Sequence, residues 1–276
     1  NRDKTELIKF DNASTVTEFT MPDTITSIDK GAFKGNTKLK KIILSKNLKS
    51  IGENAFHSST IEEIKIPASV EEIGAKAFYG TRQLKKLEFE EGCTIKALPA
   101  GVFDASSIEE LTLPEGLEYA VEKDIFRNMA KLKTLNIPSS LRDIEIGAML
   151  TRTKIQTINV NLNNEHLMVE DGILYTKDKK TLIYATQSFN KSTLDISGVE
   201  EIRKYAFYSN LKLKEVTGTS SLQSIREGAF QKSKIETIDL SSVLEIEKSA
   251  FKQSSIKDAN LENIEPSAEQ VFRRCA

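Results

Sequence analysis

The sequence predicts an α/β solenoid of about ten stacked repeats. We expect a right-handed superhelix, with short parallel strands on one face and short helical or 3₁₀ turns on the other. Two observations support this fold class: the apolar spacing of residues 39–56 recurs along the chain, and a phenylalanine closes almost every copy. Because a single copy cannot bury its own apolar edge, the copies must stack to be stable. A single solenoid domain is therefore predicted over residues 1–276.

The repeat is most regular in Leu39–Phe56, where the sequence is LKKIILSKNLKSIGENAF. Ile42 and Leu44 alternate with Lys41 and Ile43, which predicts a short strand with one apolar face and one outward face. Further apolar residues follow at wider spacing, and an Ala-Phe pair ends the unit on a predicted helical or 3₁₀ turn. Stacking buries one face of each strand, so the other face displays side chains.

The closing aromatic position recurs at nearly equal intervals within each of two runs. Met149 takes this position once, at the end of the first run. The phenylalanines that hold it are Phe33, Phe56, Phe78, Phe103, Phe126, Phe207, Phe230, Phe251 and Phe272. We expect their rings to stack as a column, each contributing roughly 1.5–3 kcal/mol by burial.

The elements follow in order from an incomplete N-terminal unit, LIKF at 7–10, which is predicted to shield the first strand edge. Seven strands are then predicted, several of them followed directly by a proline that ends the pairing. They are centred near Phe19, Ile42, Ile64, Leu87, Leu111 and Leu135, with the seventh at Ile155–Val160.

Residues 161–190 interrupt the period. Their apolar runs LMV, ILYT and TLIYA are separated by turn residues, which predicts a small antiparallel β-meander inserted into the solenoid. Four more units then run from residue 194 to Phe272. Cys93 and Cys275 lie in repeats several strand spacings apart, so no disulfide is expected between them.

The composition excludes several classes of protein. The 276 residues hold 39 Lys and Arg against 40 Asp and Glu, a net charge of −1, which disfavours nucleic acid as a partner. No apolar run approaches the length of a membrane span, which is about 20 residues. The chain begins at Asn1 rather than Met, so the lack of a signal peptide leaves secretion open; a surface or secreted protein would have its signal and anchor outside this fragment. The oligomeric state is left open by the sequence.

The repeated pattern resembles the BspA-like leucine-rich repeats of bacterial and protist surface proteins. The likeness is clearest in IEEIKIPASVEEIGAKAF at 61–78, and DGILYTKDKKTLIYA at 171–185 is similar to an interruption found among such repeats. It covers roughly residues 16–275. The resemblance implies an extracellular, often adhesive or host-interacting protein that uses the solenoid as a display surface. Members of the family do not share one ligand.

Nothing in the sequence points to catalysis. His57 and His166 are the only histidines, more than a hundred residues apart, and no metal-ligand spacing or nucleotide-binding, hydrolase or metalloprotease motif is present. No cofactor and no metal are therefore predicted. We expect a non-enzymatic cell-surface or secreted module that binds a protein or a glycan, host-derived ligands included. An intracellular interaction scaffold is the alternative, followed by an enzyme with an unrecognised site.

The outward strand positions should form rows about 4.8 Å apart across the sheet. In the first half of one row, Glu18, Lys41, Glu63, Lys86 and Glu110 alternate in sign, which predicts a self-paired charged ladder. Beyond the fifth strand the rows turn to side chains that donate and accept hydrogen bonds without strong internal pairing. The candidate ligand face there is Thr134, Asn136, Thr157, Asn159, Thr217, Asp239 and Asn260.

The insertion is a competing candidate site. It brings His166, Tyr175 and Tyr184 into a stretch that departs from the regular repeat, and such stretches often carry recognition. The alternative is that Leu174 and its apolar neighbours continue the core while the tyrosines cover its edge.

Overall fold

The computed structural model of the 276-residue chain describes residues 3–146, 155–257 and 271. Met149, Asn260, Phe272 and Cys275, to which the sequence assigns roles, lie outside these residues. The chain divides into two compact units. Unit 1 comprises Asn1–Glu145 and Met149–Glu165, and unit 2 comprises Ile146–Ala148 and His166–Ala276.

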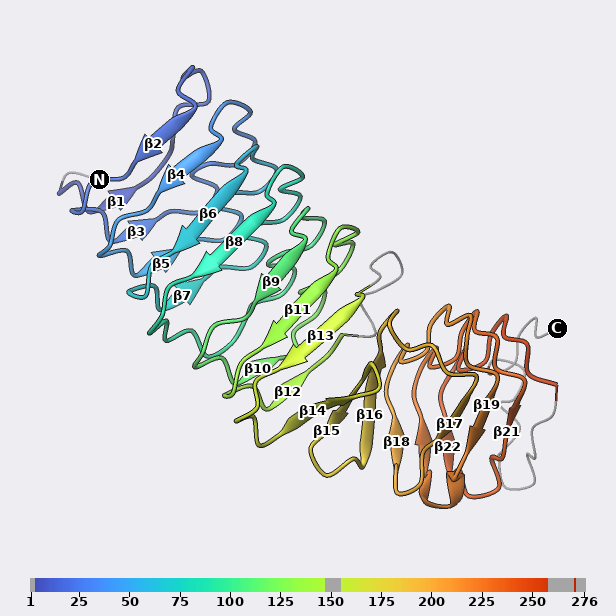
Figure 1. Cartoon of the computed structure of the whole chain (residues 1–276). Coiled ribbons are helices and arrows are strands. Elements are labelled where there is room, and N and C mark those ends of the chain that lie inside the picture. The colour runs from blue at the N-terminus through green and yellow to red at the C-terminus, as the bar shows by residue number, and fades with distance from the viewer. Residues whose placement is uncertain (1–2, 147–154, 258–270, 272–276) are drawn as a thin grey trace. The chain divides into compact units, whose positions relative to one another are not determined.

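Unit 1 carries the predicted strands side by side in one parallel sheet, which we call sheet B (Figure 1). Its order is β13-β11-β9-β8-β6-β4-β2, so successive repeats supply neighbouring strands. The strands are β2 (Glu18–Thr20), β4 (Lys41–Ile43), β6 (Glu63–Ile66), β8 (Lys86–Phe89), β9 (Glu110–Thr112), β11 (Thr134–Ile137) and β13 (Thr157–Val160). Within β6, exposed and buried residues alternate, as period-2 patterning requires. All seven predicted strand positions are confirmed.

A second set of parallel strands forms another side of unit 1, and the sequence did not predict it. Each of these strands has two residues and pairs with its counterpart in the next repeat. They are β1 (Glu6–Leu7), β3 (Ser27–Ile28), β5 (Ser50–Ile51) and β7 (Glu72–Ile73) in one sheet, and β10 (Tyr119–Ala120) and β12 (Asp143–Ile144) in another.

The third side holds the closing phenylalanines, and here the predicted helical turns are not confirmed. The described residues contain a single 3₁₀ helix, η2 (Thr219–Ser221), and no α-helix longer than one residue. Residues two before and two after the phenylalanine have positive φ, as at Asn54 (56°) and Ser58 (55°), which interrupts a right-handed helix. The backbone N–H of Phe33 donates instead to Ala55 O of the next repeat at 2.7 Å. The described fold is therefore a three-sided β-solenoid rather than an α/β one.

The predicted phenylalanine column is present in unit 1. The ring centroids of Phe33 and Phe56 are 4.8 Å apart, and those of Phe56 and Phe78 are 5.4 Å apart, with nearly parallel planes. Phe10 stacks on Phe33 at 5.2 Å, and its N–H donates to Ala32 O. The N-terminal unit thus contributes both β1 and a ring to the stack, as the prediction of an incomplete covering repeat requires.

Unit 2 begins with the predicted antiparallel meander, made of β14 (Leu167–Glu170), β15 (Ile173–Thr176) and β16 (Thr181–Ala185). Strand β16 then pairs in parallel with β18 (Glu201–Ile202). The meander therefore starts the sheet that β20 (Ser224–Ile225) and β22 (Glu245–Ile246) continue, which we call sheet D. It replaces the short second strand of a repeat and is part of the solenoid wall.

The other parallel sheet of unit 2, sheet E, contains β17 (Thr193–Asp195), β19 (Glu215–Thr217) and β21 (Thr237–Ile238). A second column of rings backs it: Phe207 and Phe251 each stack on Phe230 at 5.2 Å, and Phe189 meets Phe207 edge-on. The N–H of Phe251 donates to Val271 O, so the repeat spacing reaches Val271. No helix among the described residues is long and apolar enough to cross a membrane.

Candidate functional site

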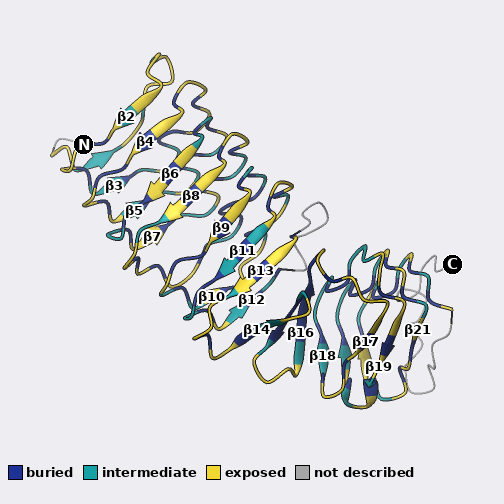
Figure 2. Cartoon of the chain, in the orientation of Figure 1, coloured by how far each residue is buried: buried dark blue, intermediate teal, exposed yellow. Residues whose placement is uncertain are grey.

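Sheet B places the four predicted polar residues of its last two strands directly beside one another. Thr134 on β11 pairs with Thr157 on β13, and Asn136 pairs with Asn159. The outward side chains of β13 are exposed and those of β11 are half-buried, as the colouring of the two strands in Figure 2 shows. The predicted rows therefore exist on one face of unit 1.

The two asparagines are hydrogen-bonded to their neighbours, against the expectation that side chains here lack strong internal pairing. Asn136 Nδ2 donates to Glu110 Oε1 and to Thr112 Oγ1, both at 2.9 Å. Asn159 Nδ2 donates to Asn136 Oδ1 at 2.8 Å. The amides thus form a ladder across β9, β11 and β13 that fixes their rotamers, because each step lies at strand spacing.

A groove of about 1030 Å³ crosses the same face from β6 to β13. Asn136 and Asn159 line it, whereas Thr134 and Thr157 do not. The groove is also lined by residues that were not predicted as site residues, among them Glu88, Phe89, Glu90, Glu91, Glu110, Glu115, Pro138 and Asn161. Ligand sites in proteins are commonly concave, with apolar surface and a few fixed polar groups. This groove is therefore the candidate site.

Two features of the sequence distinguish the repeats that form the groove. The interval from Phe78 to Phe103 is longer than those of the neighbouring repeats, and the added length falls in the loop at Glu90–Gly92 that lines the groove. Glu90 and Asn161 stand where Pro67, Pro114 and Pro138 follow the strand in other repeats. Polar residues thus replace proline after β8 and after β13, the last strand of the groove.

Charge is distributed unevenly along the groove. Towards β6 and β8, Lys65 pairs with Glu90 at 3.1 Å and Lys86 pairs with Glu88 at 2.9 Å. A hydrogen bond from Lys65 holds the pKa of Glu90 below its ordinary value, and one to Glu88 raises the pKa of Lys86. Glu90 and Lys86 therefore stay charged at neutral pH, each beside a partner of opposite charge. Of the alternating ladder, the Lys41–Glu63 pair at 3.4 Å is present.

Towards β9, β11 and β13, the lining residues include carboxylates and amides but no lysine. Glu115 accepts hydrogen bonds from Ser139 Oγ at 2.8 Å and from Asn161 Nδ2 at 3.3 Å. Glu110 is held by Asn136. Both carboxylates are thus positioned by neutral donors, and no ion pair to either is present among the described residues, although Lys86 stands beside Glu110 in the strand register.

In unit 2 the candidate Thr217 lies on the outward face of sheet E. The candidate Asp239 directly follows β21 of the same sheet. Asp239 Oδ1 accepts the N–H of Ser241 at 2.9 Å, which lowers the pKa of the carboxyl and fixes the turn after β21. Asp195 makes the same turn with Ser197 after β17. Asp195 is not among the residues predicted from the sequence, although it precedes Thr217 in the row. Forming this turn is therefore one role of an aspartate at the end of a sheet E strand.

The insertion does not present its tyrosines to solvent. Tyr175 is 6% exposed and Tyr184 is 7% exposed, and burial raises the pKa of both phenols. His166 is exposed at the start of β14. Leu174 is fully buried, so the meander continues the core as the alternative interpretation states. The three candidates do not form one surface.

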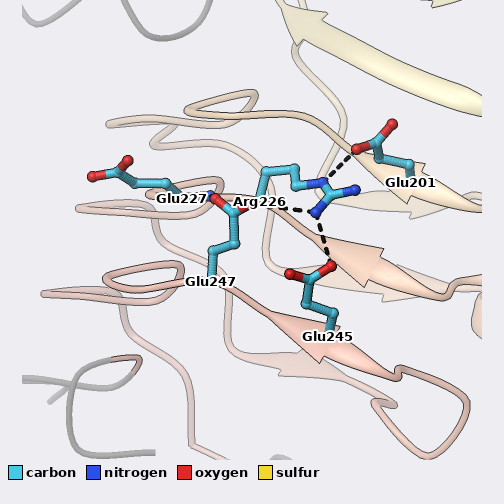
Figure 3. A network of polar contacts seen from close by, with 5 residues as sticks. All are labelled: Glu201, Arg226, Glu227, Glu245 and Glu247. Atoms are coloured by element: carbon cyan, nitrogen blue, oxygen red, sulfur yellow. Dashed lines mark hydrogen bonds and ion pairs between the residues drawn. The ribbon is translucent and has the colours of Figure 1, made fainter. Parts of the chain in front are cut away.

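Unit 2 has a polar network of its own, centred on Arg226 (Figure 3). The guanidinium donates from Nε to Glu201 Oε1 at 2.5 Å and from Nη1 to Glu245 Oε2 at 2.8 Å, and it contacts Glu247 at 3.3 Å. Glu247 in turn accepts the N–H of Glu227. One cation therefore ties three consecutive repeats together. Within the described residues, no three His, Cys, Asp or Glu side chains are placed to hold a metal ion.

Comparison with protein families gives one match. A model described as a BspA type Leucine rich repeat region matches in six copies, over residues 7–120, 51–170 and 179–276. These ranges include most of the chain. Comparison with curated proteins gives no match.

Solved structures give further similarity. The pneumococcal vaccine antigen PcpA is 26% identical with a TM-score of 0.61, over 92% of this chain and 65% of that one. A leucine-rich repeat protein from Eubacterium ventriosum is 23% identical with a TM-score of 0.67, over 88% and 65%. A leucine rich cell surface protein from Faecalibacterium prausnitzii is 19% identical with a TM-score of 0.49, over 88% and 72%. The chain thus spans 65% of the length of each of the first two.

Proposed function

The chain belongs to the BspA-type leucine-rich-repeat family, and from that premise we propose that it is a non-enzymatic binding module of the cell surface or secreted space. It recognises a protein or a glycan, host-derived ligands included, through the outward face of its stacked strands. The observation that carries the proposal is the groove across sheet B, lined by the ordered amides of Asn136 and Asn159. A signal and an anchor would lie outside this fragment.

Several features support a binding role. The amide ladder holds donors and acceptors in fixed positions, which reduces the entropy lost when a ligand is bound. The core residues behind the face, such as Leu135 and Ile158, are at most 4% exposed, so the surface is backed by a rigid stack. In unit 2, Thr217 on sheet E and Asp239 directly after β21 remain candidates on that unit's own outward face, and Asn260 is the further candidate from the sequence.

The location has separate support. The structural relative PcpA is named as a pneumococcal vaccine antigen, and an effective antigen must be reachable by antibody. A surface location for this chain is tested by antibody labelling of intact cells of the source organism, with a cytoplasmic protein as control. Labelling only after the cells are made permeable would favour an intracellular scaffold.

Binding is tested with the purified chain on an array of glycans and extracellular-matrix proteins. Replacing Thr134, Asn136, Thr157 and Asn159 together by Ala should weaken the strongest interaction about tenfold or more, since several hydrogen-bonding groups are lost. The matched control replaces Ser27 and Ser50 by Ala, on the other sheet of unit 1. Unchanged binding by the fourfold variant, with its fold intact by circular dichroism, would refute this face as the site.

A further inference from the structure

The groove on sheet B has the dimensions of a short extended peptide. It is lined from β6 to β13, which are five neighbouring strands in the order β6-β8-β9-β11-β13. Four strand spacings of about 4.8 Å give a length of about 19 Å, or about six residues of extended chain. A volume of about 1030 Å³ holds a chain of that length with its side chains. A flat sheet face would offer no such enclosure.

Two apolar residues of the groove, Phe89 and Val160, depart from the burial pattern of the repeat. Phe89 ends β8 and is half-buried, as is Val160 at the end of β13, whereas Ile66, Leu113 and Ile137 at the same position of other strands are at most 3% exposed. Phe89 also lines the groove. Of the two, Phe89 has the larger apolar side chain, and a half-buried aromatic residue beside a groove is a preferred anchor for an apolar side chain of a partner.

The charged residues that line the groove determine which sign of charge a bound partner should carry. Its lining includes Lys65, Lys85 and Lys86, all at the β6–β8 end, and Glu88, Glu90, Glu91, Glu109, Glu110 and Glu115. The lysines at that end have carboxylates beside them, as in the Lys65–Glu90 pair. The β9–β13 end holds Glu110 and Glu115 with amides and no lysine. A ligand seated there meets negative potential, which attracts a cation and repels an acidic group.

The two carboxylates also keep acceptor capacity. An ionised carboxylate has about four acceptor positions. Glu110 Oε1 takes one donor, from Asn136, and within the described residues the recorded donors to Glu115 are Ser139 and Asn161. A guanidinium or ammonium group at this end could therefore add charge-assisted hydrogen bonds without displacing the existing ones.

Resting on the proposed function, we infer that the ligand of this groove is an extended segment of a protein with basic side chains, lysine or arginine, one at Glu110 and one at Glu115, and an apolar side chain against Phe89. Acidic glycans are disfavoured by the same negative end, and neutral glycans lack the cation that the two carboxylates select. A basic segment with an apolar residue matches both the carboxylates at the β9–β13 end and the apolar contact at Phe89.

The test uses two arrayed octapeptide libraries, each with one leucine and two charged residues, which are lysine in one library and glutamate in the other. Neutral oligosaccharides are included on the same array. The chain should bind lysine peptides in preference to glutamate peptides, and raising the salt concentration should weaken that binding because exposed charges are screened. The double variant Glu110→Gln with Glu115→Gln should bind selected lysine peptides about tenfold more weakly.

Two controls separate charge from position. Glu63→Gln with Glu215→Gln removes the same charge from outward strand positions outside the groove and should leave peptide affinity unchanged. Phe89→Ser should weaken peptides with leucine more than peptides in which alanine replaces it. All variants are checked for their fold by circular dichroism, and the Gln variants keep the size and hydrogen-bonding ability of Glu.

Several outcomes would overturn the inference. Equal or stronger binding of the glutamate library, lysine-peptide binding that the Glu110 and Glu115 double variant leaves intact, or no peptide binding at all would each do so. Binding of a neutral oligosaccharide that Asn159→Ala removes would also refute the peptide ligand, yet it would leave the proposed binding function standing. The proposed function itself fails only if nothing on either array depends on the sheet B face.

Discussion

The residue that follows the short second strand of a repeat has opposite roles in the two units. In unit 1 it is glycine at two successive repeats, Gly52 and Gly74. A Cβ added at Gly74 would lie 2.6 Å from Gly52 C and 2.7 Å from Glu53 Cα of the preceding repeat. Only a residue without a side chain fits there, because backbone atoms cannot move aside as a flexible side chain can.

In unit 2 the same position is held by Arg226, which binds Glu201, Glu245 and Glu247 (Figure 3). The backbone bonding is the same in both units: Gly74 N donates to Ile51 O at 2.7 Å, as Arg226 N does to Ile202 O at 2.9 Å. The two units thus share the same hydrogen-bonded main-chain stack. The position after the short second strand, which we call the corner, holds close backbone packing in unit 1 and a charged network in unit 2.

This difference shows which parts of the repeat are constrained. The inward residues and the inter-repeat hydrogen bonds are common to both units, and they define the solenoid. The corner positions and the outward rows can vary between repeats. The groove of unit 1 lies on the outward rows, and the arginine network of unit 2 lies at a corner. Substitutions in the two units should therefore have equal effects in the core and unequal effects at the corner.

The largest effect is expected in the shared core. Phe78 and Phe230 are fully buried, each between two other phenylalanines. Phe78→Ala and Phe230→Ala should each lower the free energy of unfolding by about 3–5 kcal/mol, because a large cavity is left in a stack that relaxes only in part. Urea unfolding followed by circular dichroism measures both. A loss several-fold larger in one unit would break the equivalence of the two columns.

The next effect concerns the glycine corner of unit 1. Gly74→Ala should cost about 1–3 kcal/mol, since the new methyl group meets backbone. Gly35→Ala is the control, because Gly35 has φ of 69° but open space around it, and Ala105 holds the equivalent place at 58°. The control should cost about 1 kcal/mol from its backbone conformation alone. If Gly35→Ala proved the more damaging, close packing would not explain the glycine.

A smaller effect is expected at the corner of unit 2. Arg226→Gln removes the cation and leaves the three carboxylates to repel one another, so the free energy of unfolding should fall by about 1 kcal/mol. Added salt should restore part of the loss in the variant by screening that repulsion. Lys30→Gln, which breaks the exposed Lys30–Glu53 pair of unit 1, is the control and should change little. A loss that salt does not reduce would assign the role of Arg226 to packing.

The sequence predicts the first sheet and the columns well, for a physical reason. Strands such as Glu63–Ile66 are long enough to alternate buried and exposed residues, and proline marks the end of several. The second sheet was missed because two residues, as at Ser27–Ile28, cannot show alternation. The phenylalanine turns were taken for helices because their positive-φ positions hold unrelated residue types, among them Lys76 and Tyr205.

The candidate site was predicted in part. Asn136 and Asn159 follow from strand register alone, since outward positions in parallel strands line up. Phe89 and Glu115 could not be found in that way, because the groove depends on the added loop length after β8 and on which side chains its neighbours hold in place. Tyr175 and Tyr184 look like surface residues of an insertion, but consecutive residues of β15 and β16 are buried, so side chains on both faces of these strands are covered.

The smallest expected effect is on the pH dependence of stability. Its sign is opposite for two aspartates, one in each unit. Asp104 of unit 1 is 6% exposed, and burial raises the pKa of its carboxyl although Asn128 Nδ2 donates to it at 3.0 Å. Because the folded pKa lies above the unfolded one, the stability linked to Asp104 is present below its ordinary pKa of 3.8 and is lost as the pH rises. Asp104→Asn should therefore be more stable than the parent at pH 7.

Asp178 of unit 2 should behave in the opposite way. Hydrogen bonds from Thr176 Oγ1 and Lys180 N lower its pKa, so its contribution is present at neutral pH and is lost as the pH falls through the folded pKa. Asp178→Asn should accordingly be less stable than the parent at pH 7. Both differences should shrink in acid, where each parent carboxyl is protonated in both states. Urea unfolding across this pH range measures them, and a destabilised Asp104→Asn at pH 7 would show that Asn128 outweighs the burial of the charge.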